Sequence, residues 1–274
     1  MFFNNEQLVR YSRQIILKEV GAKGQQQLLQ SKVLVVGTGG LGSPAAMYLA
    51  AAGVGTIGLV DFDVVELSNL QRQVIHSSED IGKAKVISGM ESINKINPDI
   101  RVVTYRERIE SENVSDIFRD KDYDFVIDCT DNSASKFLIN DACVLLKKPF
   151  SHAGVSQFFG QTMTYVPGQG PCYRCVFPSP PTTVDAVPTC RDAGVLGVIP
   201  GIIGTIQATE AIKYLLNLGD LLTGSLLVFD ALDMDFRRVK IANRSNCQVC
   251  GDNPTIRNLI DYELLDCQVK VVEK

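Results

Sequence analysis

Residues 33–42 read Val-Leu-Val-Val-Gly-Thr-Gly-Gly-Leu-Gly. The unbroken apolar run at their start is typical of a central parallel strand that is buried on both faces. The glycines that follow would let a phosphate approach backbone N–H groups and the positive end of the next helix. Good helix formers continue over 44–52, and a second apolar run, 56–60, ends at Asp61. This succession predicts a βαβ unit that binds a nucleotide.

The alternation of helix and strand patterns continues downstream and changes after Pro149. We expect helices at 83–97, 136–146 and 202–216, strands at 101–105, 125–128, 226–229 and 236–241, an antiparallel hairpin within 156–167, and an extended segment over the proline-rich residues 178–188. The fold class predicted is therefore α/β, with a mixed sheet whose Rossmann-like half continues into an antiparallel half.

Composition excludes several classes of function. The chain has 274 residues, a net charge of −4 and 21% charged residues, so nothing indicates the basic stripe of a nucleic-acid-binding protein. The apolar stretch 194–208 is interrupted by Pro200 and is shorter than the roughly 20 residues of a membrane span. The first ten residues lack the apolar core of a signal peptide. We expect a cytoplasmic protein whose cysteines are metal ligands or reactive thiols, with no nucleic-acid or membrane partner.

Two CxxC pairs stand far apart, Cys172 with Cys175 and Cys247 with Cys250. Four thiolates are the ligand set of a closed, tetrahedral zinc site, which leaves no open position for catalysis. Such a zinc would be structural and would join the middle of the chain to its C-terminal region. The alternative is four unrelated buried cysteines.

The residues after the predicted strands indicate what the nucleotide is used for. Asp61 is placed to bind a ribose hydroxyl, or else to cap the next turn. The cations Arg72 and Lys85 could offset charge on phosphoryl oxygens, and Asp131 could hold Mg²⁺. The alternatives are a surface ion pair for Arg72 and a solvated helix charge for Lys85. Together the three favour adenylation over hydride transfer, although the glycine loop with Asp61 also suits an NAD(P)- or FAD-dependent oxidoreductase.

Several stretches carry a resemblance to a known family. They are Arg10-Tyr-Ser-Arg13-Gln-Ile-Ile-Leu17, the glycine loop, Asp61-Phe-Asp63, Ser68-Asn-Leu-Gln-Arg-Gln73, Asp128-Cys-Thr-Asp-Asn132, Cys172-Tyr-Arg-Cys175 and the Cys247 pair. The chain resembles the MoeB/ThiF/HesA family of ubiquitin-activating-enzyme-like adenylyltransferases. The resemblance implies a homodimer that binds ATP and Mg²⁺ and adenylates the C-terminal carboxylate of a small β-grasp sulfur-carrier protein ending in Gly-Gly, with release of pyrophosphate.

The resemblance also implies roles for individual residues. The catalytic set would be Arg13, Arg72, Lys85, Asp131 and Cys190, and the nucleotide would be bound by Gly37, Gly39, Gly40, Gly42, Asp61, Asp63, Ser68, Asn69, Leu70, Gln71, Arg72, Lys85, Asp131 and Asn132. Arg13, with Arg10 as a helper, would reach the ATP of the neighbouring subunit; the alternative for Arg13 is an ordinary surface cation. The implied division is one domain over 1–274: dimer-crossing helices in 1–30, a Rossmann-like half in 31–155, an antiparallel zinc half in 156–250 with a crossover loop at 178–195, and a tail at 251–274.

Other polar residues are less informative. Cys190 follows the proline-rich segment beside Arg191, which favours its thiolate. In relatives this position takes part in covalent sulfur transfer in some members and not in others, so its role stays open. Cys129 and Cys143 fit packing positions, and His76 and His152 have no partner pattern and default to structural roles. Cys267 receives no role.

The pathway is not fixed by the sequence. The chain stops at Lys274, without room for the C-terminal rhodanese domain of longer relatives, so we expect a persulfide-bearing protein to supply sulfur in trans. Molybdopterin or thiamin synthesis is favoured, with cysteine synthesis or tRNA thiolation as alternatives. A scaffold that binds a carrier without activating it is a third class, which the presence of Arg13, Arg72, Lys85 and Asp131 disfavours.

Overall fold

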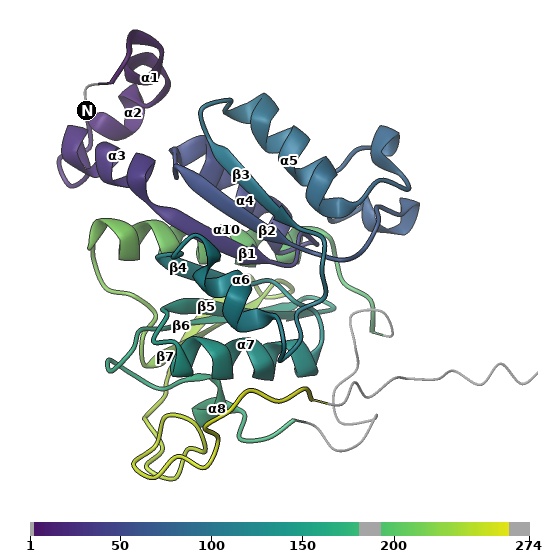
Figure 1. Ribbon diagram of the computed structural model, residues 1–274, viewed down its shortest axis with the longest axis vertical. Coiled ribbons are helices and arrows are strands. Elements are labelled where there is room, and N and C mark those ends of the chain that lie inside the picture. Colours follow the sequence, from purple (N-terminus) through teal and green to yellow (C-terminus); the bar gives the residue numbers. More distant parts are fainter. Residues whose placement is uncertain (1–2, 181–192, 263–274) are drawn as a thin grey trace, which may run out of the picture.

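The computed structural model describes residues 3–180 and 193–262. Within these ranges the strands form a single mixed sheet that crosses the molecule (Figure 1). Its order is β3 (Arg101–Tyr105), β2 (Thr56–Val60), β1 (Lys32–Val36), β4 (Phe125–Asp128), β5 (Phe150–Ser156), β6 (Phe159–Tyr165), β7 (Ser225–Asp230) and β8 (Asp235–Lys240). The first five strands are parallel and the last four pair antiparallel, so β5 belongs to both halves.

Helices cover both faces of the sheet. The helices of the described residues are α1 (Asn5–Arg10), α2 (Ser12–Ile15), α3 (Gly21–Gln30), α4 (Gly42–Ala52), α5 (Lys85–Ile96), α6 (Val114–Asp120), α7 (Ser133–Leu145), α8 (Tyr173–Val176) and α10 (Val198–Leu216), with the 3₁₀ turns η1 (Leu67–Asn69) and η2 (Ser78–Asp80). Strand β1 is buried on both faces, which explains why the apolar run 33–36 is unbroken. Val33 and Val35 pack into the core under α4 and α10, whereas Leu34 and Val36 pack into the core under α6 and α7.

The expected hairpin within 156–167 is wrong in its first strand. Strand β5 begins at Phe150, pairs in parallel with β4, and turns back into β6 at Gln157, where φ is +51°. The sequence 150–156 mixes polar and small residues with apolar ones, so it lacks the apolar run that marks the other parallel strands. The short helix α6 has no counterpart among the sequence expectations.

The N-terminal helices are held by buried polar contacts. Asn97 donates from Nδ2 to the hydroxyl of Tyr11 and to the carbonyl oxygen of Ala50, both at 2.8 Å. Tyr11 is itself buried against Gly53, whose φ of +88° ends α4 in the left-handed conformation. The helices α1, α2 and α3 therefore sit in a fixed position at one corner of the molecule (Figure 1), with Leu8, Val9, Ile16 and Leu17 exposed.

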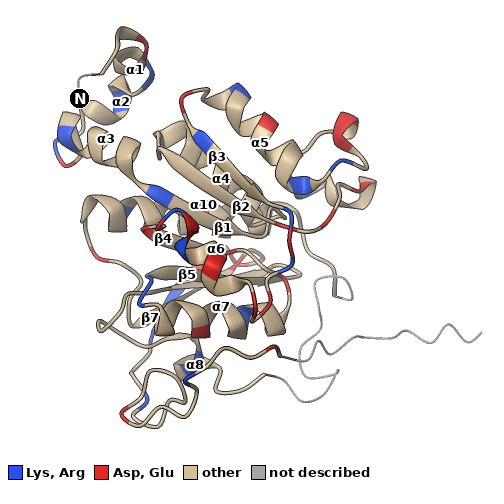
Figure 2. Cartoon of the chain, viewed as in Figure 1, with Lys and Arg blue, Asp and Glu red and all other residues tan. Residues whose placement is uncertain are grey.

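Charged residues of both signs are interspersed over the helices and loops (Figure 2). Over the described ranges, the structure contains no helix of the length and apolar character that crossing a membrane requires.

Candidate functional site

A cavity of about 610 Å³ lies at the carboxyl ends of the parallel strands, the edge at which ligands bind in open α/β sheets. Nine of the residues expected at the nucleotide line it: Gly37, Gly39, Gly40, Asp61, Asp63, Arg72, Lys85, Asp131 and Asn132. Segments 37–40, 61–63 and 129–133, far apart in sequence, meet here because each directly follows a parallel strand.

The glycine loop closes tightly against its neighbours. Gly37 has a φ of +93°, and a Cβ at this residue would lie 2.8 Å from the carbonyl oxygen of Cys129. A Cβ on Gly42 would overlap the carbonyl oxygen of Gly37. A side chain at either position would therefore force the loop open. Gly42 does not line the cavity, so its contribution in this structure is to let the start of α4 approach the loop.

Asp61 forms contacts on both carboxylate oxygens. Its Oδ2 accepts from the backbone N and the Oγ1 of Thr38, at 2.8 and 2.9 Å, and its Oδ1 accepts from the backbone N of Asp63 at 3.0 Å. The turn-capping alternative is thus present in the structure. A carboxylate has about four lone-pair sites, so Asp61 retains acceptor capacity toward the cavity that it also lines.

The two predicted phosphate-binding cations have different surroundings. Lys85 is 6% exposed, and its Nζ lies 3.0 Å from Oδ2 of Asp63. It is therefore neither solvated nor free, and the solvated-charge alternative does not describe it. Arg72 donates one hydrogen bond from Nη1 to the carbonyl oxygen of Ser68 at 3.0 Å. A guanidinium carries five N–H donors, so Arg72 keeps donors for a ligand.

Asp131 has an exposed carboxylate at the rim of the cavity. Among the residues described, none forms a hydrogen bond or ion pair with this carboxylate. The following residue, Asn132, caps α7, because its Oδ1 accepts from the backbone N of Ser135 at 2.8 Å. Within the described residues, Asp131 thus presents a carboxylate without a partner beside a capped helix start, which fits the oxygen-donor preference of Mg²⁺.

Some predicted residues lie outside the cavity. Ser68, Asn69, Leu70 and Gln71 do not line it, and the side chain of Asn69 instead accepts from the backbone N of Glu66 at 3.3 Å, which closes the η1 turn. Arg13 is exposed on α2, at the corner occupied by the N-terminal helices. Cys190 and most of the crossover loop, 181–192, lie outside the described residues.

Two further residues line the cavity that were not expected there from the sequence, Lys136 and His152, and both contact Asp128, which is buried behind the cavity wall. His152 Nδ1 lies 2.9 Å from Asp128 Oδ2, and Lys136 Nζ lies 3.6 Å from the same oxygen. Burial would raise the pKa of Asp128, but the charge of Lys136 and the hydrogen bond from His152 outweigh it and hold that pKa at about 2. Burial, followed by the Lys136 charge, lowers the pKa of His152 to about 4.

These three residues could not be found from spacing alone. Asp128 and His152 are 24 residues apart and meet because β4 and β5 pair in parallel, a pairing that was not predicted from the sequence. A signal was present in the polar residues at the end of the apolar run 125–128. The other histidine, His76, is buried between Ser88 Oγ, at 2.8 Å, and the carbonyl oxygen of Thr38, at 3.3 Å.

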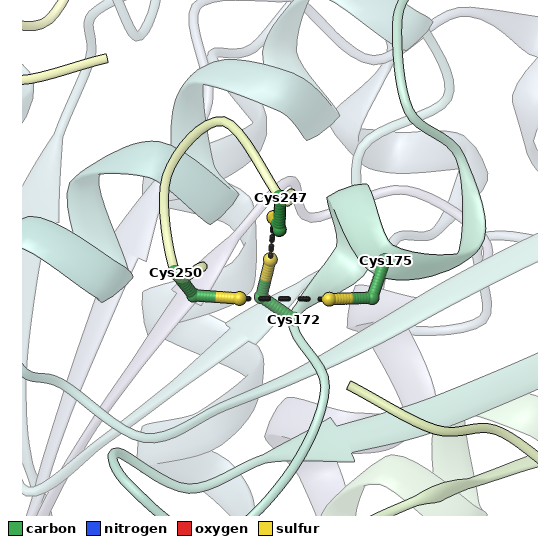
Figure 3. Close-up of side chains that lie close together, drawn as sticks. All are labelled: Cys172, Cys175, Cys247 and Cys250. Atoms are coloured by element: carbon green, nitrogen blue, oxygen red, sulfur yellow. Dashed lines mark hydrogen bonds between the residues drawn. The ribbon is translucent and has the colours of Figure 1, made fainter. Parts of the chain in front are cut away.

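The four predicted zinc ligands converge (Figure 3). The Sγ atoms of Cys172, Cys175, Cys247 and Cys250 all lie within 4.8 Å of one another. The Cys172–Cys247 and Cys175–Cys250 sulfur pairs are 3.6 and 3.5 Å apart. A tetrahedron with Zn–S bonds of 2.3 Å has S–S edges of about 3.8 Å, so the cluster has nearly the required size. Three of the four residues are buried, and none forms a disulfide.

The four-cysteine cluster is connected to helix α7 through Arg174. This residue lies between two of the cysteines in sequence and pairs with Asp141 of α7 through Nε and Nη2, at 2.7 and 2.9 Å. Tyr262, from the C-terminal segment, contacts the same guanidinium through its hydroxyl at 2.6 Å. The cluster, helix α7 and residues near 262 therefore form one connected unit.

A glycine loop, two cations and an exposed carboxylate at the carboxyl edge of a parallel sheet are typical of a Rossmann-like nucleotide-binding fold, here with a four-cysteine cluster. The ThiF family matches residues 11–249, and the chain belongs to this family.

Two curated relatives illustrate the similarity. The chain is 47% identical over 272 residues to the adenylyltransferase and sulfurtransferase MOCS3 of Culex quinquefasciatus, an alignment that covers 99% of this chain and 61% of that protein. It is 47% identical over 268 residues to a sulfur carrier protein adenylyltransferase of Thermus thermophilus, covering 96% of this chain and 98% of that protein. The chain thus spans about three fifths of the length of the MOCS3 proteins that it matches.

A solved structure has the same fold. The crystal structure of E. coli MccB superposes with a TM-score of 0.79 at 24% sequence identity, covering 92% of this chain and 75% of that one. At this identity the likeness concerns the fold.

Proposed function

We propose that this protein is an ATP-dependent adenylyltransferase that activates the C-terminal Gly-Gly carboxylate of a ubiquitin-like sulfur-carrier protein. The observation that carries the proposal is the convergence of Arg72, Lys85 and the unpaired carboxylate of Asp131 around one cavity behind a glycine loop. The names of the Culex and Thermus relatives support the same activity.

The geometry supports the following roles for the residues in the adenylation step. The phosphates of ATP lie along the glycine loop, where backbone N–H groups and the start of α4 favour negative charge. The carboxylate of the carrier attacks the α-phosphorus, a new P–O bond forms, and the bond to the pyrophosphate oxygen breaks. Arg72 and Lys85 stabilise the charge that gathers on the phosphoryl oxygens. The carboxylate is already ionised at neutral pH, so this step needs no general base.

The proposed Mg²⁺ would be held by Asp131. When bound, it neutralises phosphate charge and orients the triphosphate. Lys85 and Asp63 form an ion pair at 3.0 Å, which keeps the ammonium at the cavity wall before the nucleotide arrives. Asn132 contributes by fixing the start of α7 directly after Asp131.

We further propose a homodimer in which Arg13 completes the active site of the partner. Arg13 lies on α2, before the first strand, whereas the cavity lies at the opposite, carboxyl ends of the strands. The exposed apolar side chains of Leu8, Val9, Ile16 and Leu17 beside it are suited to burial in a subunit interface. The roles of Ser68, Asn69, Leu70 and Gln71 at the nucleotide, and of Cys190 in sulfur transfer, remain predictions.

The proposed zinc is structural. Its four thiolate ligands leave no free coordination position, and the cluster connects residues 172–175 to residues 247–250. The sulfur donor is proposed to be a separate persulfide-bearing protein, and the location cytoplasmic. The domain division given above is part of the same proposal, and we propose in addition that the antiparallel half docks the carrier.

The experiment that tests the proposal is ATP–pyrophosphate exchange by the purified protein with a panel of small Gly-Gly-ended carriers. Exchange is expected only with ATP, Mg²⁺ and a cognate carrier together, and the acyl-adenylate should be detected by mass spectrometry. Hydride transfer with NAD(P) and no exchange with any carrier would favour the oxidoreductase alternative and overturn the proposal.

A further inference from the structure

Thr130, the residue before Asp131, is held at every polar atom of its backbone and side chain. Its backbone N and its Oγ1 donate to Oδ1 of Asp128, at 3.0 and 2.6 Å. Its carbonyl oxygen accepts from Nζ of Lys136 at 2.6 Å. The exposed carboxylate of Asp131 therefore extends from backbone that has little freedom to move, although no described residue contacts the carboxylate itself.

Lys136 connects this loop to the neighbouring strand. It projects from the first turn of α7 and donates from the same Nζ to the carbonyl oxygen of Ala153 on β5, at 2.7 Å. The ammonium thus bridges the loop after β4 and the body of β5. An ammonium has three donors, and two are used on backbone carbonyls, so the geometry is that of a structural cross-link.

The positive charge of Lys136 is compensated in place. The residue is 8% exposed, and burying an ammonium is costly unless it is paired and hydrogen-bonded. Oδ2 of Asp128, 3.6 Å away, supplies the opposite charge, and this oxygen also accepts the hydrogen bond from His152. Asp128 thus accepts hydrogen bonds from Thr130 of the loop with Oδ1 and compensates the charge of Lys136 with Oδ2.

From these contacts we infer that Lys136 is a positioning residue for the proposed metal site: it fixes the loop so that the Asp131 carboxylate is pre-oriented toward a divalent cation on the nucleotide. The inference rests on the proposed function only in that Asp131 is taken as the cation ligand. Partners that orient a metal ligand typically contribute a factor of 10 to 100 in metal affinity, so loss of the cross-link should weaken cation binding.

The test is a titration of Mn²⁺ by electron paramagnetic resonance in the presence of a non-hydrolysable ATP analogue. In Lys136→Met, Mn²⁺ binding should weaken about tenfold or more, while binding of the metal-free analogue stays within about twofold. Amide hydrogen exchange should accelerate in a peptide covering residues 129–132. Lys136→Arg, which keeps the charge and the donors, should recover most of the Mn²⁺ affinity.

Two further variants separate positioning from stability. Lys148→Met is the matched control, because Lys148 likewise has an aspartate partner, at 2.7 Å, and a backbone carbonyl acceptor, at 2.9 Å, but does not line the cavity. It should leave Mn²⁺ binding unchanged. If Lys136→Met does not fold because Asp128 is left with too little compensation, the double variant Lys136→Met/Asp128→Asn removes both charges and keeps an acceptor oxygen for Thr130.

The possible results distinguish a failure of the proposed function from a failure of the positioning role. Failure of the unaltered protein to bind the Mn²⁺–nucleotide complex would count against the proposed function itself. If the unaltered protein binds it and the Lys136 variants bind Mn²⁺ equally well, the positioning role is wrong. Equal weakening of the metal-free analogue and of Mn²⁺ would instead make Lys136 a direct phosphate contact, which also overturns the inference.

Discussion

Asp128 and His152 are direct partners in the parallel register of β4 and β5, and their side chains meet at 2.9 Å with both groups buried. Since the pKa of His152 is lowered to about 4, the imidazole is neutral at pH 7. Its Nδ1–H then donates to the Asp128 carboxylate, and Nε2 is left as an acceptor. The pair therefore places a neutral ring beside the cavity, where a charged one would oppose Lys136.

The first prediction concerns this pair and pH. An unfolded histidine has a pKa near 6.5, above the folded value of about 4, so the unfolded state binds the proton first as pH falls. The stability due to the neutral His152 is complete above about pH 6.5 and is lost progressively toward pH 4. We expect His152→Gln to reduce the loss of unfolding free energy between pH 7 and pH 5 by about 2 kcal/mol, measured by urea unfolding.

The second histidine provides an internal reference for that measurement. His76 remains in the variant, since the chain contains two histidines, so any residual slope reports His76 and the carboxylates. An unchanged slope in His152→Gln would show that the ring is not held neutral by its surroundings.

The second prediction concerns Asp131. Asp131→Ala removes the unpaired carboxylate from the cavity rim and should lower carrier-dependent ATP–pyrophosphate exchange by roughly three orders of magnitude, with no change in thermal stability beyond about 0.5 kcal/mol. Asp116→Ala, an exposed carboxylate on α6 that does not line the cavity, is the matched control and should exchange normally. Normal exchange by Asp131→Ala would remove this residue from the mechanism.

The third prediction concerns the partner subunit. If Arg13 acts across the dimer, mixing Arg13→Ala with Asp131→Ala protein should restore activity, because each mixed dimer contains one site with both residues intact. After random reassortment of equal amounts, about a quarter of the unaltered activity is expected. If Arg13 instead acts in the active site of its own subunit, the mixture should be as inactive as its two components. That result would rule out the shared site.

The fourth prediction concerns the four cysteines. Cys250→Ser removes one ligand from the cluster and should lower zinc content well below one ion per chain, with a fall in melting temperature, because metal binding contributes directly to the folding free energy. Cys143→Ser serves as the control, since this buried cysteine lies on α7 outside the cluster. Zinc content is measured by atomic emission and the melting temperature by calorimetry, for both variants. Full zinc occupancy in Cys250→Ser would contradict a four-thiolate site.

Much of the parallel half could be predicted from sequence because its signals are local. The apolar runs at 33–36 and 56–60 correspond to β1 and β2, and the expected helix at 83–97 corresponds to α5, Lys85–Ile96. The convergence of Gly37, Asp61 and Asp131 followed from the rule that the carboxyl ends of parallel strands share one edge.

The part that could not be predicted depends on pairing between distant segments. The first residues of β5, from Phe150, are held by β4 and β6 on both sides, and this support compensates for a sequence that is only weakly typical of a strand. Without β5 in place, nothing in the spacing brings His152 to Asp128 or gives Lys136 its acceptor on Ala153. By contrast, the two CxxC pairs predict the cysteine cluster without any knowledge of which strands pair.

Helix α7 connects the cavity that Asp131 lines to the region of the cysteine cluster. Its amino end follows Asp131, and Asp141, near its other end, forms the ion pair with Arg174, which lies between Cys172 and Cys175 in sequence. The helix has 13 residues, a length of about 20 Å, and so forms a rigid rod between two sites that share no ligand. If the cluster holds the proposed zinc, we expect its removal by a chelator to lower the affinity for ATP at chelator concentrations below those that unfold the chain.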